Sequence, residues 1–219
     1  MYKLKTKTRL YGVFKPYMYT SPVCSGRSMF DKCVEFEAFA DIVVRLFGVV
    51  TGLREKWPKV KTLKVWSSYL ALTLIMLVNG VRVSEAVRAA ARFYELGERR
   101  LTIRASKRGG ERTVLIPDFI EREDLEHAYT EAVRVGEKAV RLRLKDWLRR
   151  ALGVNPHSIR YAFIRYTALT GRSPEVIARA LGVKKADTIK KYYLQGLESI
   201  GGGEGHGALG AHESAGRME

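Results

Sequence analysis

Residues 69–85, Tyr69-Leu-Ala-Leu-Thr-Leu-Ile-Met-Leu-Val-Asn-Gly-Val-Arg-Val-Ser-Glu85, carry the strongest structural signal in the chain. The first ten are almost all apolar, but ten residues are too few to span a bilayer comfortably, so they predict a buried core helix. Asn-Gly at 79–80 is typical of the C-terminus of such a helix. Ser84 can then cap a further helix to about Leu96, with Glu85 favourably placed in its first turn.

Helical patterns also lie on both sides of this segment. A helix is predicted from Asp31 to Val50, and Thr51-Gly52 is expected to break it. The core helix is expected to begin near Pro58. Further along, Ser173-Pro174 predicts another helix start, because a capping residue precedes a proline at the first helical position.

The convincing β signal lies at residues 100–116. Arg100-Leu-Thr-Ile-Arg104 and Arg112-Thr-Val-Leu-Ile116 both alternate with period two, and a turn at Lys107-Arg-Gly-Gly110 separates them. A hairpin among helices predicts a mainly α protein with a small antiparallel β-sheet, in the α+β class.

Three parts of the chain are expected. Residues 1–50 would form an N-terminal extension with the first helix, and residues 51–200 the main domain. The glycine-rich residues 201–219 would form a flexible tail.

The charge of the chain predicts a polyanionic partner. There are 39 Lys and Arg against 23 Asp and Glu, giving a formal net charge of +16 and a pI near 10.0. Such an excess suits nucleic acid, because each neutralised phosphate releases condensed counterions. The alternative is a basic protein from an extreme environment without a nucleic-acid partner. Asparagine occurs only at 79 and 155 and glutamine only at 195, which indicates a thermophile.

Two cysteines, Cys24 and Cys33, are too few for a disulfide framework or a zinc site. The basic N-terminus has no apolar segment behind it and is not a secretory signal. These features favour a cytoplasmic protein without a membrane partner.

Five residues could together perform phosphodiester chemistry. Arg82 follows a helix end and can donate two hydrogen bonds to phosphate oxygens. Lys107, at the mouth of the hairpin turn, can give a proton to a leaving alkoxide. His157 and Arg160 lie three apart on a helix and therefore share a face, where one can move a proton and the other neutralise charge. Tyr192, on an amphipathic helix, is a nucleophile if nearby cations favour its phenolate.

Each of these residues alone also fits a structural role, so their order and surroundings decide. Asn79-Gly-Val-Arg-Val-Ser-Glu85, Ser106-Lys-Arg-Gly-Gly-Glu-Arg112 with Val-Leu-Ile-Pro117, and His157-Ser-Ile-Arg160 with Phe163 occur in that order. Gly171, Ile177 and Leu181-Gly182 then lead to Thr188 and Tyr192. From Pro58 to Leu194 the chain resembles the catalytic domain of tyrosine recombinases, the site-specific integrases.

The resemblance implies a mechanism. Tyr192 would attack a DNA phosphate to give a 3′-phosphotyrosyl bond while Arg82 and Arg160 clamp the non-bridging oxygens. His157 would handle the tyrosine proton, Lys107 would protonate the leaving 5′ oxygen, and no metal or other cofactor would be needed. It also implies double-stranded DNA as partner, a homotetramer on DNA from a monomer in solution, and an origin in a prokaryote, virus or plasmid.

Several basic residues are predicted to hold the DNA. From residue 141 to 150 the chain is expected to be helical, with an apolar stripe turned inward and a basic face that is either solvated or in contact with phosphate. The predicted DNA contacts are Arg108, Arg143, Arg149, Arg150 and Lys185.

Two departures from the family pattern leave alternatives open. Val183 stands where the family usually has His, and Lys184 or Lys185 would have to supply the missing donor. The segment before Trp57 is too short for the separate core-binding domain of the family together with the first catalytic helix. A type IB topoisomerase, a DNA-binding module without catalysis and an inactive remnant of an integrase therefore remain as alternatives.

Overall fold

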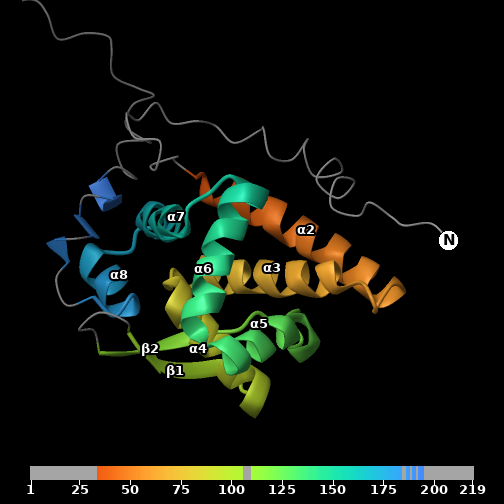
Figure 1. The fold of residues 1–219 in the computed structure, drawn as a ribbon. Helices are drawn as coiled ribbons and strands as arrows, with labels where there is room; N and C mark the ends of the chain where they lie inside the picture. Colours follow the sequence, from red (N-terminus) through yellow and green to blue (C-terminus); the bar gives the residue numbers. More distant parts are fainter. Residues whose placement is uncertain (1–33, 106–109, 184–185, 188, 191, 195–219) are drawn as a thin grey trace, which may run out of the picture.

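The computed structural model describes residues 34–105, 110–183, 186–187, 189–190 and 192–194. In this part of the chain, helices surround one central helix, α3 (Lys61–Asn79), and a two-stranded antiparallel sheet lies beside it. Helices α2 and α7 lie on one side of α3, and α4, α5 and the sheet lie on the other (Figure 1). The expected mainly α architecture with a small antiparallel sheet is confirmed.

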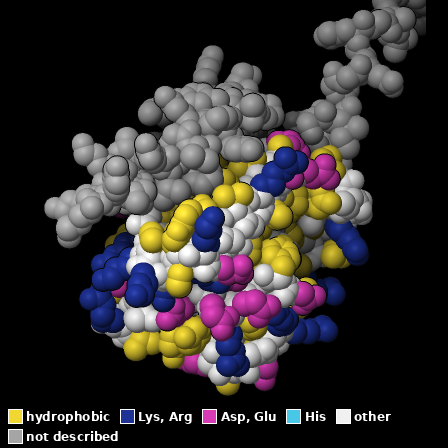
Figure 2. Space-filling view, turned by 90° about the vertical axis from the view of Figure 1, so that its right-hand side faces the viewer, with side chains coloured by type: hydrophobic (Ala, Val, Ile, Leu, Met, Phe, Trp, Pro, Cys, Tyr) yellow, Lys and Arg dark blue, Asp and Glu magenta, His cyan; other side chains and the backbone are white. Residues whose placement is uncertain are grey.

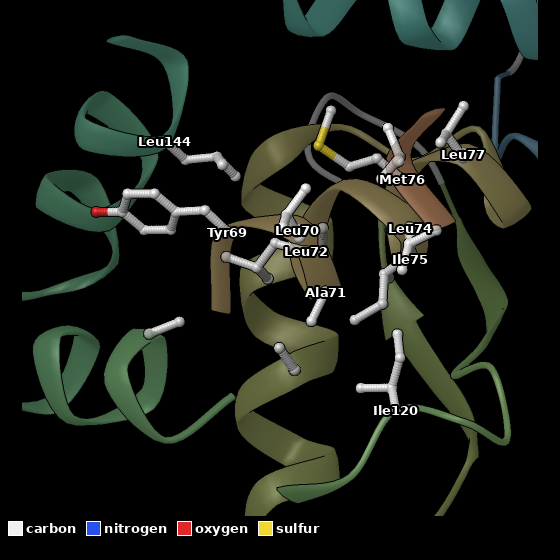
Figure 3. Packing of buried hydrophobic residues seen from close by; sticks show 14 of the residues in the cluster. Tyr69, Leu70, Ala71, Leu72, Leu74, Ile75, Met76, Leu77, Ile120 and Leu144 are labelled. Carbon is white, nitrogen blue, oxygen red and sulfur yellow. The ribbon is translucent and has the colours of Figure 1, made fainter. Parts of the chain in front are cut away.

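Helix α3 forms the centre of the core because it is apolar all round. Its side chains point in every direction, with Tyr69 toward Leu144 and Ile75 toward Ile120 (Figure 3). It begins three residues after the expected Pro58 and ends, as expected, at Asn79, where Gly80 takes the left-handed conformation with φ 57°. It is long and apolar enough to cross a membrane, but 78% of its apolar window is buried inside the protein, as in core helices.

Helix α2 (Phe36–Lys56) differs from the predicted helix at both ends. It begins after Glu35, whose carboxylate accepts hydrogen bonds from two main-chain N–H groups of the first turn; Asp31 itself lies outside the described residues. The predicted break at Thr51-Gly52 is wrong. The Thr51 hydroxyl donates to the carbonyl of Phe47, and the apolar face continues through Leu53 onto the core. This packing offsets the roughly 1 kcal/mol that a glycine costs within a helix.

Helix α4 (Val83–Leu96) leads into the hairpin of β1 (Arg100–Arg104) and β2 (Glu111–Leu115). The helix ends where predicted, but its N-cap is Arg82 rather than Ser84, which lies within the first turn. The side-chain amide of Asn79 attaches β2 to the end of α3, since it donates to the Leu115 carbonyl and accepts from the Leu115 N–H, both at 2.8 Å.

Helix α5 (Arg122–Val135) packs against α3 and α4. Helix α6 (Glu137–Trp147) packs on α4 and α5 and continues as a π-helical turn, Leu148–Leu152. The predicted inward stripe is confirmed, since Leu144, Leu148 and Ala151 are buried and Trp147 packs edge-on against Trp66 and Tyr69 of α3.

Helix α7 (Pro156–Leu169) carries His157 and Arg160, as expected, and α8 (Pro174–Ala180) begins where Ser173-Pro174 predicts. Asn155 caps the first through its side-chain oxygen, and Ser173 caps the second. A smaller apolar cluster joins the two helices to the segment that follows them: Ile164, Ile177, Ala178, Leu181 and Ile189.

Candidate phosphate-binding site

The site is built on the segment between α3 and α4. Arg82 ends this segment and caps α4, and its backbone N–H donates to the Glu85 carboxylate at 3.0 Å. The Arg82 guanidinium donates to the other oxygen of the same carboxylate at 3.2 Å. Glu85 is fully buried, whereas the Arg82 side chain keeps 25% of its surface exposed. Arg82 is therefore oriented from the protein side and open to an anion from the solvent side.

Arg160 reaches the same segment from α7. Its guanidinium donates to the carbonyl of Gly80 at 2.8 Å, although the two residues are 80 positions apart. Burial, and then the charge of Arg82, lower the pKa of Arg160 to about 10, so it stays protonated at neutral pH. Two of the predicted residues, Arg82 and Arg160, thus meet at the same main-chain segment, and the charge of Arg82 acts on Arg160.

Arg112 of β2 is a third guanidinium at this place, and the sequence analysis missed it. It is 5% exposed and donates to the carbonyls of Asn79 at 2.6 Å and Leu181 at 3.1 Å, and to Glu85 at 3.4 Å. Burial lowers its pKa to about 10, partly countered by Glu85. The alternation along 112–116 could have revealed it, because it puts Arg112 on the same face as Val114, which is buried.

The charges at this place favour an anion. The charge of Arg82 acts on both Arg112 and Arg160, and so does the buried carboxylate of Glu85. Three positive charges and one negative charge leave a local excess of two. Arg82 is the partly exposed member of the group, so an anion with several acceptor oxygens, such as a phosphate, would bind there in the field of the other two guanidiniums.

An aromatic column lies next to the arginines. The ring of Tyr192 stacks on that of Tyr161, with centroids 3.8 Å apart and an angle of 15° between the planes. On Tyr161 also lies the His157 ring, with centroids 6.3 Å apart and an angle of 24° between the planes. Tyr161 follows Arg160 directly in α7 and influences its pKa. Tyr192, His157 and Arg160, all predicted site residues, are thus connected through Tyr161, which the sequence analysis did not single out.

Val183 has a structural role. Together with Tyr192 and Tyr193 it packs, half-buried, against the small cluster of α7 and α8, and its N–H donates to the Ala178 carbonyl at 2.9 Å. An apolar side chain suits this position. Four predicted residues lie outside the described residues: Lys107, Arg108, Lys184 and Lys185.

The predicted DNA contacts of α6 and its π-helical turn are exposed but already paired. Arg143 pairs with Glu131, and Arg149 and Arg150 both approach Asp146, at 3.4 and 3.8 Å. On the face drawn in Figure 2, basic and acidic side chains are interspersed with exposed apolar ones. Among the described residues, no group of His, Cys, Asp and Glu is arranged to hold a metal ion.

Comparison with known proteins suggests an integrase family. Over 127 residues, 58% of this chain, it is 36% identical to "Putative integrase ORF241" of Acidianus two-tailed virus. It is also 29% identical over 150 residues to "Uncharacterized protein MJ0770" of Methanocaldococcus jannaschii. The matched segments span 52% and 67% of these relatives. No family model and no solved structure matches the chain.

Proposed function

We propose that this chain is the catalytic part of a tyrosine recombinase that cleaves and rejoins DNA during integration. The observation that carries the proposal is the convergence of Arg82 and Arg160 on one main-chain segment, with Tyr192 stacked on the residue next to Arg160. The similarity to a viral protein named as an integrase supports the same class of reaction. The net charge of +16 suits double-stranded DNA as substrate.

The reaction is a reversible transesterification. The Tyr192 hydroxyl attacks the scissile phosphorus, the bond to the 5′ oxygen breaks, and a 3′-phosphotyrosyl bond forms. His157 accepts the tyrosine proton, and Lys107 donates a proton to the leaving 5′ oxygen. Arg82 and Arg160 hold the non-bridging oxygens, where negative charge increases in the transition state. A 5′-hydroxyl of a second strand then reverses the step, so no nucleotide cofactor and no metal is required.

The remaining basic residues bind the duplex. Arg108 and Lys185 contact backbone phosphates near the site, and Lys184 supplies the donor that Val183 cannot. Arg143, Arg149 and Arg150 exchange their carboxylate partners for phosphates. The chain acts as a tetramer on DNA and is monomeric in solution, in the cytoplasm of a prokaryotic host.

One observation favours a second candidate. Val183 packs into an apolar cluster at a position where a donor to phosphate would otherwise help catalysis. A DNA-binding fragment of an integrase that has lost its cleavage activity would also contain the arginine cluster. The two candidates differ in whether a covalent protein–DNA bond forms.

The test uses duplexes from the natural host element, nicked near the cleavage site so that the cleaved fragment diffuses away and the adduct accumulates. We expect a band on a denaturing gel that contains both protein and DNA. Tyr192→Phe should abolish it because the nucleophilic oxygen is removed, and Arg82→Lys should lower its rate of formation by about tenfold or more.

Tyr193→Phe is the matched control, since Tyr193 is adjacent in sequence and packs against the same cluster. It should leave the adduct unchanged. Loss of the adduct in Tyr193→Phe instead of Tyr192→Phe would move the nucleophile by one position. Duplex binding without an adduct on any nicked substrate would favour the non-catalytic fragment, and relaxation of supercoils without strand exchange would indicate a topoisomerase.

A further inference from the structure

We propose that Arg112 is a positioning residue that fixes the Tyr192 segment against the arginine pair formed by Arg82 and Arg160. This inference rests on the proposed function. Arg112 does not reach the solvent side of the site, so it acts through the groups that it holds.

The contacts of Arg112 join its own strand, β2, to two segments far from it in the chain, residues 79–85 and the end of α8. One terminal nitrogen donates to the Asn79 carbonyl at 2.6 Å, which belongs to the segment before Arg82. The other lies 3.4 Å from Glu85, whose carboxylate also binds Arg82, and 3.1 Å from the Leu181 carbonyl. Leu181 lies at the end of α8, from which the chain leads to Tyr192.

The Leu181 turn packs closely on this side of the site, with the Leu181 side chain next to Gly80. Next to Leu181, Gly182 adopts a left-handed conformation with φ 61°, and a Cβ added there would lie 3.7 Å from the Arg112 side chain and 3.0 Å from Ala105. The backbone of the turn therefore passes close to the hairpin at the level of Arg112. Loss of Arg112 would remove the hydrogen bond that holds the turn to the hairpin, and would also remove a partner of the Glu85 carboxylate that orients Arg82.

A lysine cannot replace Arg112 fully. The guanidinium reaches three acceptors through its two terminal nitrogens, and its Nε has no hydrogen-bond partner among the described residues. An ammonium is a single point on a flexible chain and cannot span acceptors on opposite sides. Arg112→Lys should therefore keep the positive charge but lose part of the connection.

Arg99 is the matched control. It too is an arginine beside the hairpin that donates to two main-chain carbonyls, those of Pro117 at 2.8 Å and Ile120 at 2.9 Å. These contacts lie in the connection from β2 to α5, away from the arginine pair. Arg99→Lys therefore removes similar hydrogen bonds and should lower stability without affecting the site.

The experiment measures two quantities on the full chain with the nicked duplex: the single-turnover rate of adduct formation at saturating protein, and the Kd for the duplex. Arg112→Lys should lower the rate by about tenfold or more, because small displacements of reacting groups are costly. Its Kd should change less than about threefold, since the phosphate-binding charges remain. For Arg99→Lys, both quantities should stay within about threefold of wild type while its Tm falls. Should Arg112→Lys fail to fold, Arg112→Gln takes its place.

A second readout does not depend on catalysis. In side-chain NMR spectra of protein labelled with 15N-arginine, the Nε–H signal of Arg82, assigned through Arg82→Lys, should shift in the Arg112 variant and not in Arg99→Lys. Equal loss of rate in the Arg112 and Arg99 variants, or an unchanged Arg82 signal, would overturn the inference. Absence of an adduct in wild type would refute the proposed function alone, and the NMR comparison would still decide the role of Arg112.

Discussion

Replacement of Gly80 by alanine tests whether the main chain between α3 and α4 is as tightly confined as the site requires. Gly80 has φ 57°, in the left-handed region that L side chains rarely adopt. An added Cβ would lie 2.3 Å from Cδ1 of Phe163 and 2.8 Å from Cδ2 of Leu181. The Gly80 carbonyl also accepts the hydrogen bond of Arg160.

The expected loss of stability has two parts. A non-glycine residue in the left-handed region costs about 1 to 2 kcal/mol. The clash adds the cost of inserting a methyl group into a packed region, typically about 1 to 3 kcal/mol. The free energy of unfolding should therefore fall by about 2 to 5 kcal/mol, a large part of the roughly 5 to 15 kcal/mol available to a domain.

Gly153→Ala separates the two parts. Gly153 also ends a helix with a positive φ, 66°, but an added Cβ there would meet no atom within 4 Å. It should lose only the conformational part, about 1 to 2 kcal/mol. Urea unfolding followed by circular dichroism measures both variants against wild type, with the m-value as a check that the compactness of the end states is unchanged.

The two variants should also differ in activity. Gly80→Ala has to displace Phe163, Leu181 or its own backbone, and each of these moves a group that supports Arg160 or the Tyr192 segment. It should slow adduct formation on the nicked duplex, whereas Gly153→Ala should not. Equal unfolding free energies for the two variants would refute the argument, because Phe163 and Leu181 would then have room to yield.

Two further predictions concern rings near the site and in the core. Tyr161→Leu removes the ring on which Tyr192 stacks and should slow adduct formation by about tenfold. Tyr161→Phe keeps the stack and should be near wild type. Equal rates for the two variants would exclude a role of the stack. Burial, and then the charges of Arg143 and Arg134, lower the pKa of His127 below its usual 6.5 in the folded state. Below pH 6.5 the His127 imidazole therefore binds a proton more readily in the unfolded chain than in the folded one. The stability that neutral His127 contributes should be fully present above pH 6.5 and be lost as the pH falls below it. Urea unfolding at several pH values should show this loss in wild type and a smaller one in His127→Gln.

The sequence predicted those elements whose ends are determined locally. Asn79-Gly80 ended a helix because glycine takes the left-handed conformation at little cost, and Ser173-Pro174 started one because both residues favour the first turn. The hairpin followed from strict alternation. At Thr51-Gly52, however, the outcome depended on whether the apolar face continued onto the core, and that is a property of packing rather than of two residues.

The same distinction explains which site residues could be predicted. Arg82 and Arg160 were identified by their local sequence, and the fold brings them together. Arg112 was missed because a basic residue in a strand next to a basic turn usually faces solvent. The alternation with Val114 puts it on the inward face, but the acceptors that satisfy it there come from Asn79 and Leu181, 33 and 69 residues away, and are not part of that local pattern.

The arrangement of the two apolar clusters explains why such long-range contacts matter for the chemistry. Arg82 belongs to a segment whose neighbours, Val81 and Val83, are part of the large core around α3, so its backbone is held by many buried side chains. Tyr192 instead packs against a cluster of five buried residues from α7, α8 and the segment that follows α8. A segment with few buried contacts opens at a lower free energy than the core does. The proposed reaction needs the phenol and the guanidiniums in fixed positions at the same time, so the small cluster has to be connected to the large one. Among the described residues, the Arg112 contact with Leu181 and the Arg160 contact with Gly80 contribute to that connection, together with the apolar packing of Phe163 against Gly80 and Phe36. The position of the proposed nucleophile therefore depends on these few long-range contacts as well as on the packing of its own small cluster.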